Sequence, residues 1–343
     1  MSSEVTVVGA GIFGLACAWQ LIRRGAQVRV LEADRIGAGS SGGNVGALAP
    51  HAPEVWKSKK QIQLESLLAQ EAFWAGVAAA SGRDPGYARA GRLQPVAPDG
   101  IARAEARIAG AAAHWPEGTE MRLIEDPPGS LAESGLWLWD NLTARLTPRR
   151  GLAALAAAIR AGGGVIEEGC GEVQSDALRG PVIWATGAPG LARLSTDTGQ
   201  NCGTGVKGQS ALLEWPHADG PQLFLDGLHV VPHGDGTVAI GSTSEREFTE
   251  PDSTDEQLEA VIARARTEVP ALADAAVVER WAGVRPRAPS RAPLIGPYPG
   301  RPGHIIANGG FKIGFGMAPW VADAVARLVL DGSGDGIPPE WLP

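Results

Sequence analysis

The stretch EVTVVGAGIFGLACAWQLIRRGAQVRVLE, residues 4–32, decides the fold of this chain. A β-branched run at Glu4–Val8 is followed by an apolar helical stretch at Leu15–Arg24, and a second β-branched run occupies Gln27–Leu31. Short β-branched runs favour buried strands, and Gly25 stands where a glycine commonly ends a helix. The chain is therefore predicted to begin with a βαβ unit whose two strands are parallel.

Three glycines, Gly9, Gly11 and Gly14, connect the first strand to the helix. In a dinucleotide-binding turn they permit a tight turn, let the backbone approach a pyrophosphate, and let the helix pack closely. The unpaired N–H groups of the helix then face the phosphates, and Glu32 is placed to accept hydrogen bonds from ribose hydroxyls. Glu32 disfavours a 2′-phosphate, but this fingerprint does not separate FAD from NAD. The predicted cofactor contacts of this unit are Gly9, Gly11, Ile12, Phe13, Gly14, Glu32 and Ala33.

The composition is that of an ordinary globular protein. The 343 residues include 30 Lys and Arg against 38 Asp and Glu, which gives a net charge of −8. This acidic balance without a basic run argues against nucleic acid or an anionic membrane as the main partner. No apolar run has the roughly 18 residues of a membrane-spanning helix, and no secretory signal is recognisable. The scattered Cys17, Cys170 and Cys202 argue against a disulfide framework or a metal cluster, so we expect a cytoplasmic protein without a metal site.

Beyond the βαβ unit, helical patterns alternate with β-rich stretches. Helices are expected at 59–81, 101–113, 150–161, 255–269 and 319–330. Strands are expected at 165–168, 181–185, 211–215, 229–232, 237–241 and 304–307. Ser253 or Thr254 is the expected cap of the fourth helix, and Pro319 is expected in the first turn of the last one. The order predicts a nucleotide-binding layer interrupted by a β-rich layer.

Four further segments, together with the glycine turn, resemble the D-amino acid oxidase–like flavoproteins, a family that includes glycine oxidases and sarcosine oxidases. They are SSGGNVGAL at 40–48, ATGA at 185–188, WAGVRPRAP at 281–289 and NGGFKIGFGMAP at 308–319. They occur in the order of the family and span almost the whole chain. The resemblance implies FAD as the cofactor and an α/β fold, in which a Rossmann-like FAD-binding domain is interleaved with a smaller antiparallel β-rich substrate domain. It also implies oxidation of an amine or amino acid.

The same resemblance implies domain boundaries and cofactor contacts. We expect the FAD-binding domain at 1–85, 142–208 and 282–343, and the substrate domain at 86–141 and 209–281. For Val173, an ordinary strand valine is an equal alternative to an adenine contact. The further implied cofactor contacts are Ser40, Ser41, Gly42, Asn44, Val45, Gly46, Ala47, Leu48, Val173, Ala185, Thr186, Gly187, Gly283, Arg285, Gly310, Phe311, Lys312, Ile313 and Gly314.

Arg285 matches the arginine with which the family holds the substrate carboxylate. Two parallel N–H bonds from a guanidinium fix both the position and the angle of a carboxylate. Hydride transfer to flavin N5 is chemistry of the cofactor, so the protein mainly has to hold the substrate in place. We expect Gly314, Gly316 and Met317 to precede the last helix and to stabilise negative charge on the N1–C2=O side of the flavin.

The chain departs from the family at the substrate contacts. Its two tyrosines, Tyr87 and Tyr298, lie away from strand 229–232, where many relatives have a substrate-contacting tyrosine and this chain has His229. Lys312 replaces an arginine common in glycine oxidase–like members; it is expected to contact the substrate, to hold a water near flavin N5, or to pair with a carboxylate at the rim. His51, just after the loop at 40–48, is an alternative polar contact, although an exposed loop histidine is the favoured interpretation. The predicted catalytic residues are Arg285, Lys312, His229 and His51.

These observations predict an FAD-dependent oxidoreductase that oxidises the C–N bond of a small amino acid or secondary amine to an imine. Sarcosine oxidases often attach the flavin to a cysteine just past the arginine motif, and the segment 289–297 has none, so noncovalent FAD is expected. Oxygen or another acceptor reoxidises the flavin. One alternative is a relative of the tRNA carboxymethylaminomethyl-modifying flavoenzymes, which the segment 46–51 resembles. A non-catalytic flavin- or NAD-binding module is another.

Overall fold

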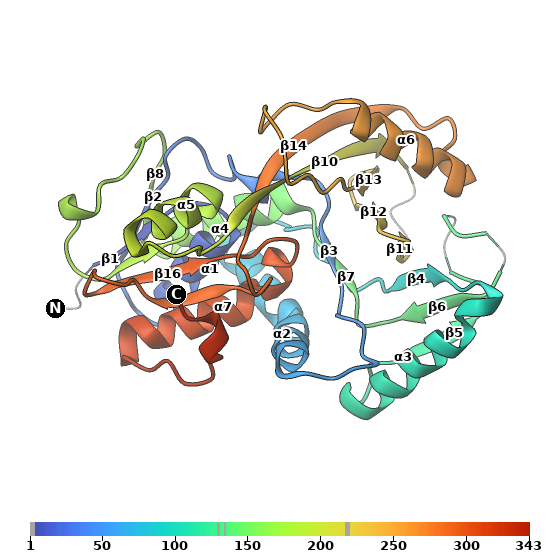
Figure 1. Ribbon diagram of the computed structural model, residues 1–343, viewed down its shortest axis with the longest axis horizontal. Helices are drawn as coiled ribbons and strands as arrows, with labels where there is room; N and C mark the ends of the chain where they lie inside the picture. The colour runs from blue at the N-terminus through green and yellow to red at the C-terminus, as the bar shows by residue number, and fades with distance from the viewer. Residues whose placement is uncertain (1–3, 129–130, 134, 217–219) are drawn as a thin grey trace.

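The computed structural model describes residues 4–128, 131–133, 135–216 and 220–343 (Figure 1). The described residues form two large sheets, one of six strands and one of eight. A two-stranded ribbon of β3 (Ala47–Leu48) and β7 (Ala144–Arg145) lies between the two sheets. The α/β fold class predicted from the sequence is confirmed.

The six-stranded sheet has β1 near its centre. In spatial order its strands are β15 (Leu294–Pro297), β16 (His304–Asn308), β9 (Val182–Trp184), β1 (Val5–Val8), β2 (Val28–Leu31) and β8 (Val165–Glu167). All neighbours are parallel except β15, which pairs antiparallel with β16. Every residue of β1 is buried, as expected for the inner strand of a parallel sheet covered on both faces.

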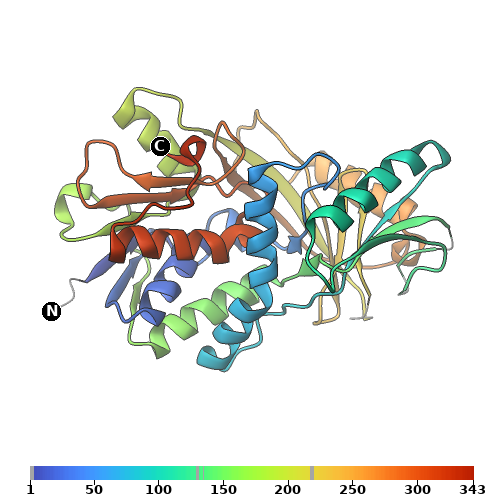
Figure 2. The ribbon, with the colours of Figure 1, turned by 90° about the horizontal axis from the view of Figure 1, so that it is seen from below.

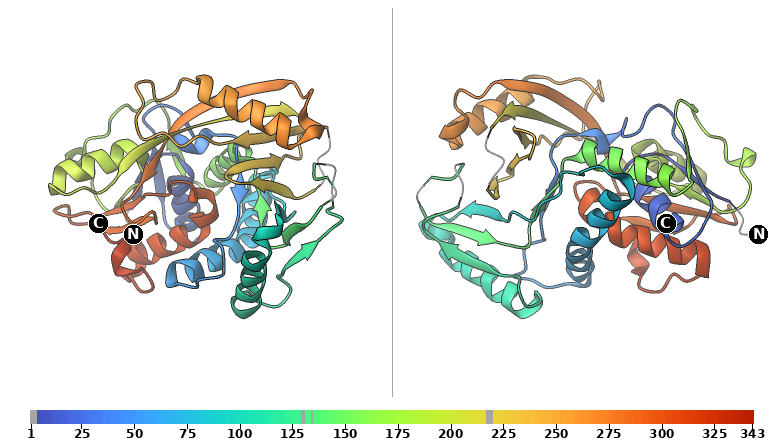
Figure 3. Two further views of the ribbon diagram at one scale, coloured as in Figure 1. Left: turned by 45° about the vertical axis from the view of Figure 1, so that its right-hand side comes forward. Right: turned by 180° about the vertical axis from the view of Figure 1, so that it is seen from behind.

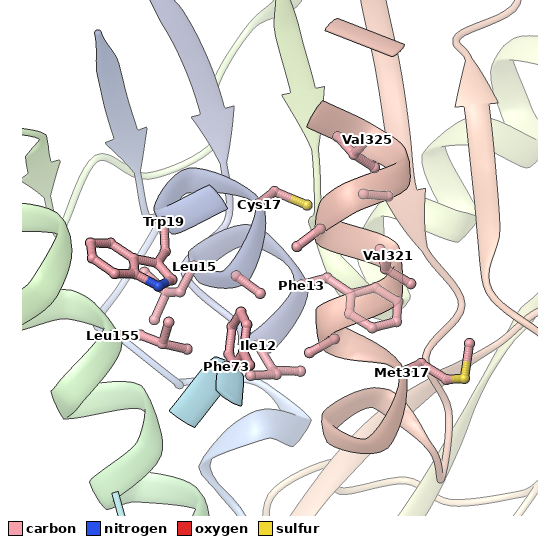
Figure 4. Close-up of a cluster of buried hydrophobic side chains, with 14 of the residues drawn as sticks. Ile12, Phe13, Leu15, Cys17, Trp19, Phe73, Leu155, Met317, Val321 and Val325 are labelled. Atoms are coloured by element: carbon pink, nitrogen blue, oxygen red, sulfur yellow. The ribbon is translucent and has the colours of Figure 1, made fainter. Parts of the chain in front are cut away.

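Helices cover both faces of this sheet (Figure 2). On one face lie α1 (Ile12–Arg23), α4 (Pro148–Ala161) and α7 (Gly314–Asp331), with α2 (Ser58–Ser81) packed across α4 and α7, and α5 (Gly187–Thr198) covers the other face. Figure 4 shows the apolar contact between α1 and α7, in which Phe13 lies beside Met317 and Val321. This contact fixes the N-terminal ends of both helices relative to the sheet.

The eight-stranded sheet forms the other half of the molecule (Figure 3). In spatial order its strands are β14 (Val277–Arg287), β10 (Thr204–Glu214), β13 (Thr237–Gly241), β12 (Leu228–Pro232), β11 (Gln222–Leu225), β4 (Arg92–Pro95), β6 (Trp137–Asp140) and β5 (Met121–Ile124). Only β11 and β4 pair in parallel. The sheet is covered by α6 (Glu256–Glu268) and, at the β5 edge, by α3 (Ile101–His114). Short 3-10 turns occur at Ser40–Gly42, Pro98–Gly100, Ser175–Ala177, Pro270–Leu272 and Pro339–Trp341.

The last helix begins five residues earlier than the sequence indicates. Gly314, Gly316 and Met317 were expected to precede it, but they form its first turns, and Pro319 lies inside. Proline has no N–H to donate to the carbonyl four residues before it, here that of Phe315. The side-chain amide of Gln70 on α2 donates to Phe315 O at 3.0 Å and so replaces the missing bond.

A second correction concerns the start of α6. Neither Ser253 nor Thr254 caps this helix; the Asp255 side chain accepts a hydrogen bond from the Gln257 amide at 3.0 Å. A carboxylate at this position also stabilises the positive end of the helix. The same carboxylate accepts from the side chain of Gln209 on β10 at 2.8 Å, which ties α6 to the sheet beneath it.

Strands β10 and β14 each cross one predicted domain boundary. β10 spans the boundary at 208/209 and β14 that at 281/282, and the two strands pair along most of their length. The division into two domains therefore stays a prediction. Its ranges also include residues 1–3, 129–130, 134 and 217–219, which lie outside the described residues.

Candidate functional site

A cavity of about 1350 Å³ extends from the six-stranded sheet to the eight-stranded sheet. Val8 and Trp184, the last residues of β1 and β9, line it, as does Glu32 directly after β2. The cavity thus begins at the carboxyl ends of the parallel strands, where open α/β sheets bind their ligands. Its volume exceeds that of pockets for drug-sized molecules, so it has room for a dinucleotide together with a small substrate.

The glycine turn between β1 and α1 is held by close backbone packing. A Cβ atom on Gly9 would lie 2.5 Å from Ala185 O, and one on Gly14 would lie 1.9 Å from Gly9 O. At Gly11, the nearest atom to an added methyl group would be Ser41 Oγ at 3.1 Å. Gly9 and Gly14 are therefore required by the protein itself, whereas Gly11 leaves open the space that a ligand would use.

Two side chains fix the amides at this turn. Glu32 Oε2 accepts a hydrogen bond from the Ala10 amide at 2.6 Å, and Glu32 Oε1 accepts one from the Asp34 amide at 3.1 Å. Ser41 Oγ accepts one from the Ile12 amide at 3.0 Å, at the start of α1. Glu32 and Ser41, both expected as cofactor contacts, therefore also shape the turn.

Three helices direct their N-terminal ends at the cavity. The lining includes Gly11 at the start of α1, Thr186 and Gly187 at the start of α5, and Gly314 and Gly316 in the first turn of α7. Helix N-termini carry a partial positive charge and unpaired N–H groups, which favour anions such as a pyrophosphate. Together with the open space at Gly11, this arrangement fits the FAD implied by the sequence.

Most of the predicted site residues line this one cavity. They are Gly9, Gly11, Ile12, Phe13, Glu32, Ala33, Ser40, Ser41, Val45, Gly46, Ala47, Val173, Ala185, Thr186, Gly187, His229, Gly283, Arg285, Gly310, Phe311, Lys312 and Gly314. The remaining ones are not part of its lining: Gly14, Gly42, Asn44, Leu48, His51 and Ile313. Asn44, for example, is buried and accepts a hydrogen bond from the Ser210 hydroxyl of β10.

The cavity also includes residues that the sequence did not single out. Trp184 directly precedes the expected Ala185 contact at the end of β9, so its position along the strand was sufficient to find it. Phe224 faces His229 across the β11–β12 hairpin. Phe248 and Ser242 reach the lining only through the loop between β13 and α6, and no local pattern marks them.

Arg285 extends from β14 diagonally across the neighbouring strand β10. Its Nη1 donates to Thr243 O at 3.2 Å, and its guanidinium occupies the space above Gly208, where a Cβ would lie 1.7 Å from Nη1. Burial lowers the pKa of Arg285 to about 10, so it remains a cation at neutral pH. The nearby Glu245 is paired with the buried Lys207 at 3.7 Å. Within the described ranges, Arg285 forms no ion pair.

Lys312 and His229 lie in the same region of the cavity. Partial burial and the charge of Arg285 lower the pKa of Lys312. Burial and the charges of Arg92, Lys312 and Arg285 lower the pKa of His229 to about 4, so its imidazole is neutral at pH 7. The imidazole packs on Phe224 with ring centroids 4.8 Å apart, and its buried Nδ1 has no hydrogen-bond partner in the described structure.

Of His51 and the two tyrosines, His51 and Tyr87 are outside the cavity lining, and Tyr298 lines it near α5. The His51 amide donates to Gln63 Oε1 of α2 at 2.7 Å, and the residue is not part of the cavity lining. Tyr298 lines the cavity near α5, where its hydroxyl donates to Asp197 at 2.8 Å. Tyr87 is not part of the lining. Over the described ranges, no group of three or more metal-ligating side chains is close enough to hold a metal ion.

Three histidines give the fold a predictable response to acid. The pKa values of His51, His229 and His233 are each lowered to about 4, mainly by burial. In the unfolded chain they titrate near pH 6.5, so the unfolded state binds more protons below that pH. The contribution of these three histidines to the free energy of unfolding is fully present above about pH 6.5. It is lost, and the free energy of unfolding falls, as the pH drops towards 4.

We expect the urea midpoint to decrease between about pH 6.5 and 5, and His233→Gln to flatten this decrease. His233 suits the test because its Nε2 is buried without a partner in the described structure and it lies outside the cavity lining. If the urea midpoint of His233→Gln fell with pH as steeply as that of the wild type, a lowered pKa of His233 would be contradicted.

The comparisons with known proteins identify the family of this chain. The family model for FAD dependent oxidoreductases (DAO) matches residues 4–328. The chain is 30% identical to the putative thiamine biosynthesis oxidoreductase ThiO of Rhizobium etli, over 96% of this chain and 98% of that protein. It is 28% identical to the glycine oxidase of Pseudomonas aeruginosa, over 96% of this chain and 94% of that protein. It also matches the bifunctional ThiO/ThiG protein of Synechocystis sp. at 29% identity, but spans only 52% of that protein's length.

The crystal structure of glycine oxidase from Geobacillus kaustophilus has the same fold. The two structures superpose with a TM-score of 0.86 at 22% identity, over 99% of this chain and 98% of that one. The four segments and the glycine turn that carried the resemblance all lie within the range matched by the family model. The chain belongs to the DAO family of FAD-dependent oxidoreductases.

Proposed function

We propose that this protein oxidises the C–N bond of a small amino acid or N-substituted amino acid to an imine. The observation that carries the proposal is the position of Arg285, a half-buried cation without an ion-pair partner in the described ranges, in the same cavity as the dinucleotide-type turn. Bound FAD supplies the hydride acceptor for this reaction. The glycine oxidase of Pseudomonas aeruginosa, a relative over nearly its full length, supports the substrate class.

Each part of the cavity has a role in this proposal. The turn at Gly11 and the first turns of α5 and α7 would hold FAD, and the positive end of α7 would stabilise negative charge on it. Arg285 would bind the substrate carboxylate through two parallel N–H groups. Thr243 O and the absence of a side chain at Gly208 keep this guanidinium in one orientation.

The environment of the substrate nitrogen also fits amine oxidation. An amine must be unprotonated to lose a hydride from its neighbouring carbon, and nearby cations lower the pKa of an ammonium group. Lys312 supplies such a charge. The neutral His229 ring adds no charge to this end of the cavity. Phe224, which packs against the His229 ring, adds an apolar surface to this part of the cavity.

An anaerobic screen of amino acids and secondary amines tests the proposal. The purified flavoprotein is mixed with each amine, and the visible flavin absorbance is followed. We expect at least one small amine carboxylate to bleach it, and air to restore the colour if oxygen is the acceptor. A protein that retains FAD but is bleached by no amine would point instead to a non-catalytic flavin-binding module.

Two further properties accompany the proposal. We expect FAD to be noncovalent, so acid precipitation should leave the yellow colour in the supernatant, and a yellow pellet would contradict this. A cytoplasmic location is supported by the free cysteines Cys17, Cys170 and Cys202. Among the described residues, no helix has both the length and the apolar character needed to cross a membrane.

A further inference from the structure

The cavity separates its cations into two groups. At the end near α5, Arg193 and Arg301 line the cavity and both pair with Asp197, Arg193 at 2.9 Å. At the end near β14, Arg285 and Lys312 line it, and neither forms an ion pair within the described ranges. The second pair is therefore a local excess of two positive charges.

Backbone contacts hold Arg285 and Lys312 close to each other. The amide of Phe311 donates to Pro286 O at 3.0 Å, which ties the segment before α7 to β14 one residue away from Arg285. Phe311 takes up a left-handed conformation with φ 41°, which is rare for a non-glycine residue. The Lys312 ammonium lies 5.8 Å from the centre of the Phe311 ring. The structure thus brings the second cation to the first.

Acidic side chains balance this excess only in part: Glu245 attracts Arg285 but is itself paired with Lys207 at 3.7 Å, and no acid forms an ion pair with Lys312 in the described structure. Asp252 lines the same cavity but forms no ion pair with either cation in the described structure. Arg92, a third cation near His229, is already paired with Asp140 at 3.1 Å. Two like charges that are partly desolvated and close together are stabilised when an anion of matching charge binds between them. A single carboxylate on Arg285 would leave Lys312 unmatched.

We propose that the substrate is an amine with two carboxylates, of which one binds Arg285 and the second binds Lys312. This inference rests on the proposed function and specifies its substrate class. The two carboxylates flank the amine, as in an N-carboxymethyl amino acid, or are joined through a short side chain, as in an acidic amino acid. Lys312 then determines specificity, because it contacts only the second carboxylate.

Two matched secondary amines test this inference. Iminodiacetate differs from N-methylglycine by one added carboxylate and keeps the same reacting carbon. We expect kcat/KM of the wild-type holoenzyme to be at least about tenfold higher for iminodiacetate, mostly through a lower KM, since one charge pair of about 1.4 kcal/mol gives this factor. Lys312→Gln should bring the ratio of the two kcat/KM values close to one, and Lys312→Arg should keep it.

Lys57→Gln is the matched control, because Lys57 is an exposed lysine outside the cavity lining; it should keep the wild-type ratio. Binding provides a readout apart from turnover. Malonate should raise the Tm of the wild-type holoenzyme more than acetate does, and Lys312→Gln should remove this difference.

The outcomes separate the two proposals. Equal kcat/KM values for the two amines in the wild type would overturn the dicarboxylate inference, while amine oxidation would stand. An equal loss for both amines in Lys312→Gln would also overturn it, and would place Lys312 at the cofactor. If no amine of any kind bleaches the flavin, the proposed function itself fails.

Discussion

Replacing Arg285 with leucine should lower kcat/KM for the amine substrate by about 10²–10³-fold. Removing one partner of a buried charge pair costs about 2–5 kcal/mol, and each 1.4 kcal/mol corresponds to a factor of ten. Leucine fills much of the space of the arginine stem, and its introduction leaves no acid unpaired, because Glu245 keeps Lys207 at 3.7 Å. Steady-state kinetics together with the FAD content of the variant measure the effect. Wild-type saturation by the substrate in Arg285→Leu would refute the carboxylate contact.

Gly208→Ala tests the same contact without removing the charge. A Cβ at this position would lie 1.7 Å from Arg285 Nη1, so the guanidinium has to move away from Thr243 O. We expect a smaller loss than in Arg285→Leu, mostly as a higher KM. Gly234→Ala is the matched control, since no atom lies within 4 Å of its added methyl group, and it should behave as the wild type.

The sequence was sufficient for the parts of the structure that local patterns determine. The βαβ unit at 4–32 has all its signals within one short stretch, and its two strands and helix lie where they were predicted, with the helix starting at Ile12 rather than Leu15. Gly9, Gly11 and Glu32 line the cavity, whereas Gly14 does not. These features follow from strand and helix periodicity and from steric limits at three glycines.

The parts that were missed depend on contacts between distant segments. Helix α7 starts earlier than predicted, with Pro319 in its interior. The hydrogen bond to Phe315 O that Pro319 cannot make is replaced by one from Gln70, which lies 245 positions before Phe315 in the sequence. His51 follows the small-residue loop in sequence but lies outside the cavity lining, with its amide bound to Gln63 of α2. The place of Arg285 above Gly208 depends on the register of β10 against β14. A single sequence does not encode such registers in a readable pattern.

Alanine at Gly11 and alanine at Gly14 should impair the protein in different ways. At Gly14 the new methyl group would meet the backbone atom Gly9 O at 1.9 Å, so we expect a lower Tm even without cofactor, by a destabilisation of about 1–3 kcal/mol or more. At Gly11 it would meet only the Ser41 hydroxyl at 3.1 Å and otherwise enter the cavity. Gly11→Ala should therefore fold normally but bind FAD roughly 10–10²-fold more weakly, since overpacking by a methyl group costs about 1–3 kcal/mol.

The Tm of the apoprotein and the FAD dissociation constant from flavin fluorescence separate these two effects. Gly76→Ala is the control on α2, where no atom lies within 4 Å of the added methyl group; it should leave FAD binding unchanged and slightly raise the Tm, because alanine favours a helix more than glycine does. Wild-type FAD affinity in Gly11→Ala would mean that the pyrophosphate does not approach this turn. The anion would then have to bind at the N-terminal ends of α5 and α7, since these are the other helix ends directed into the cavity.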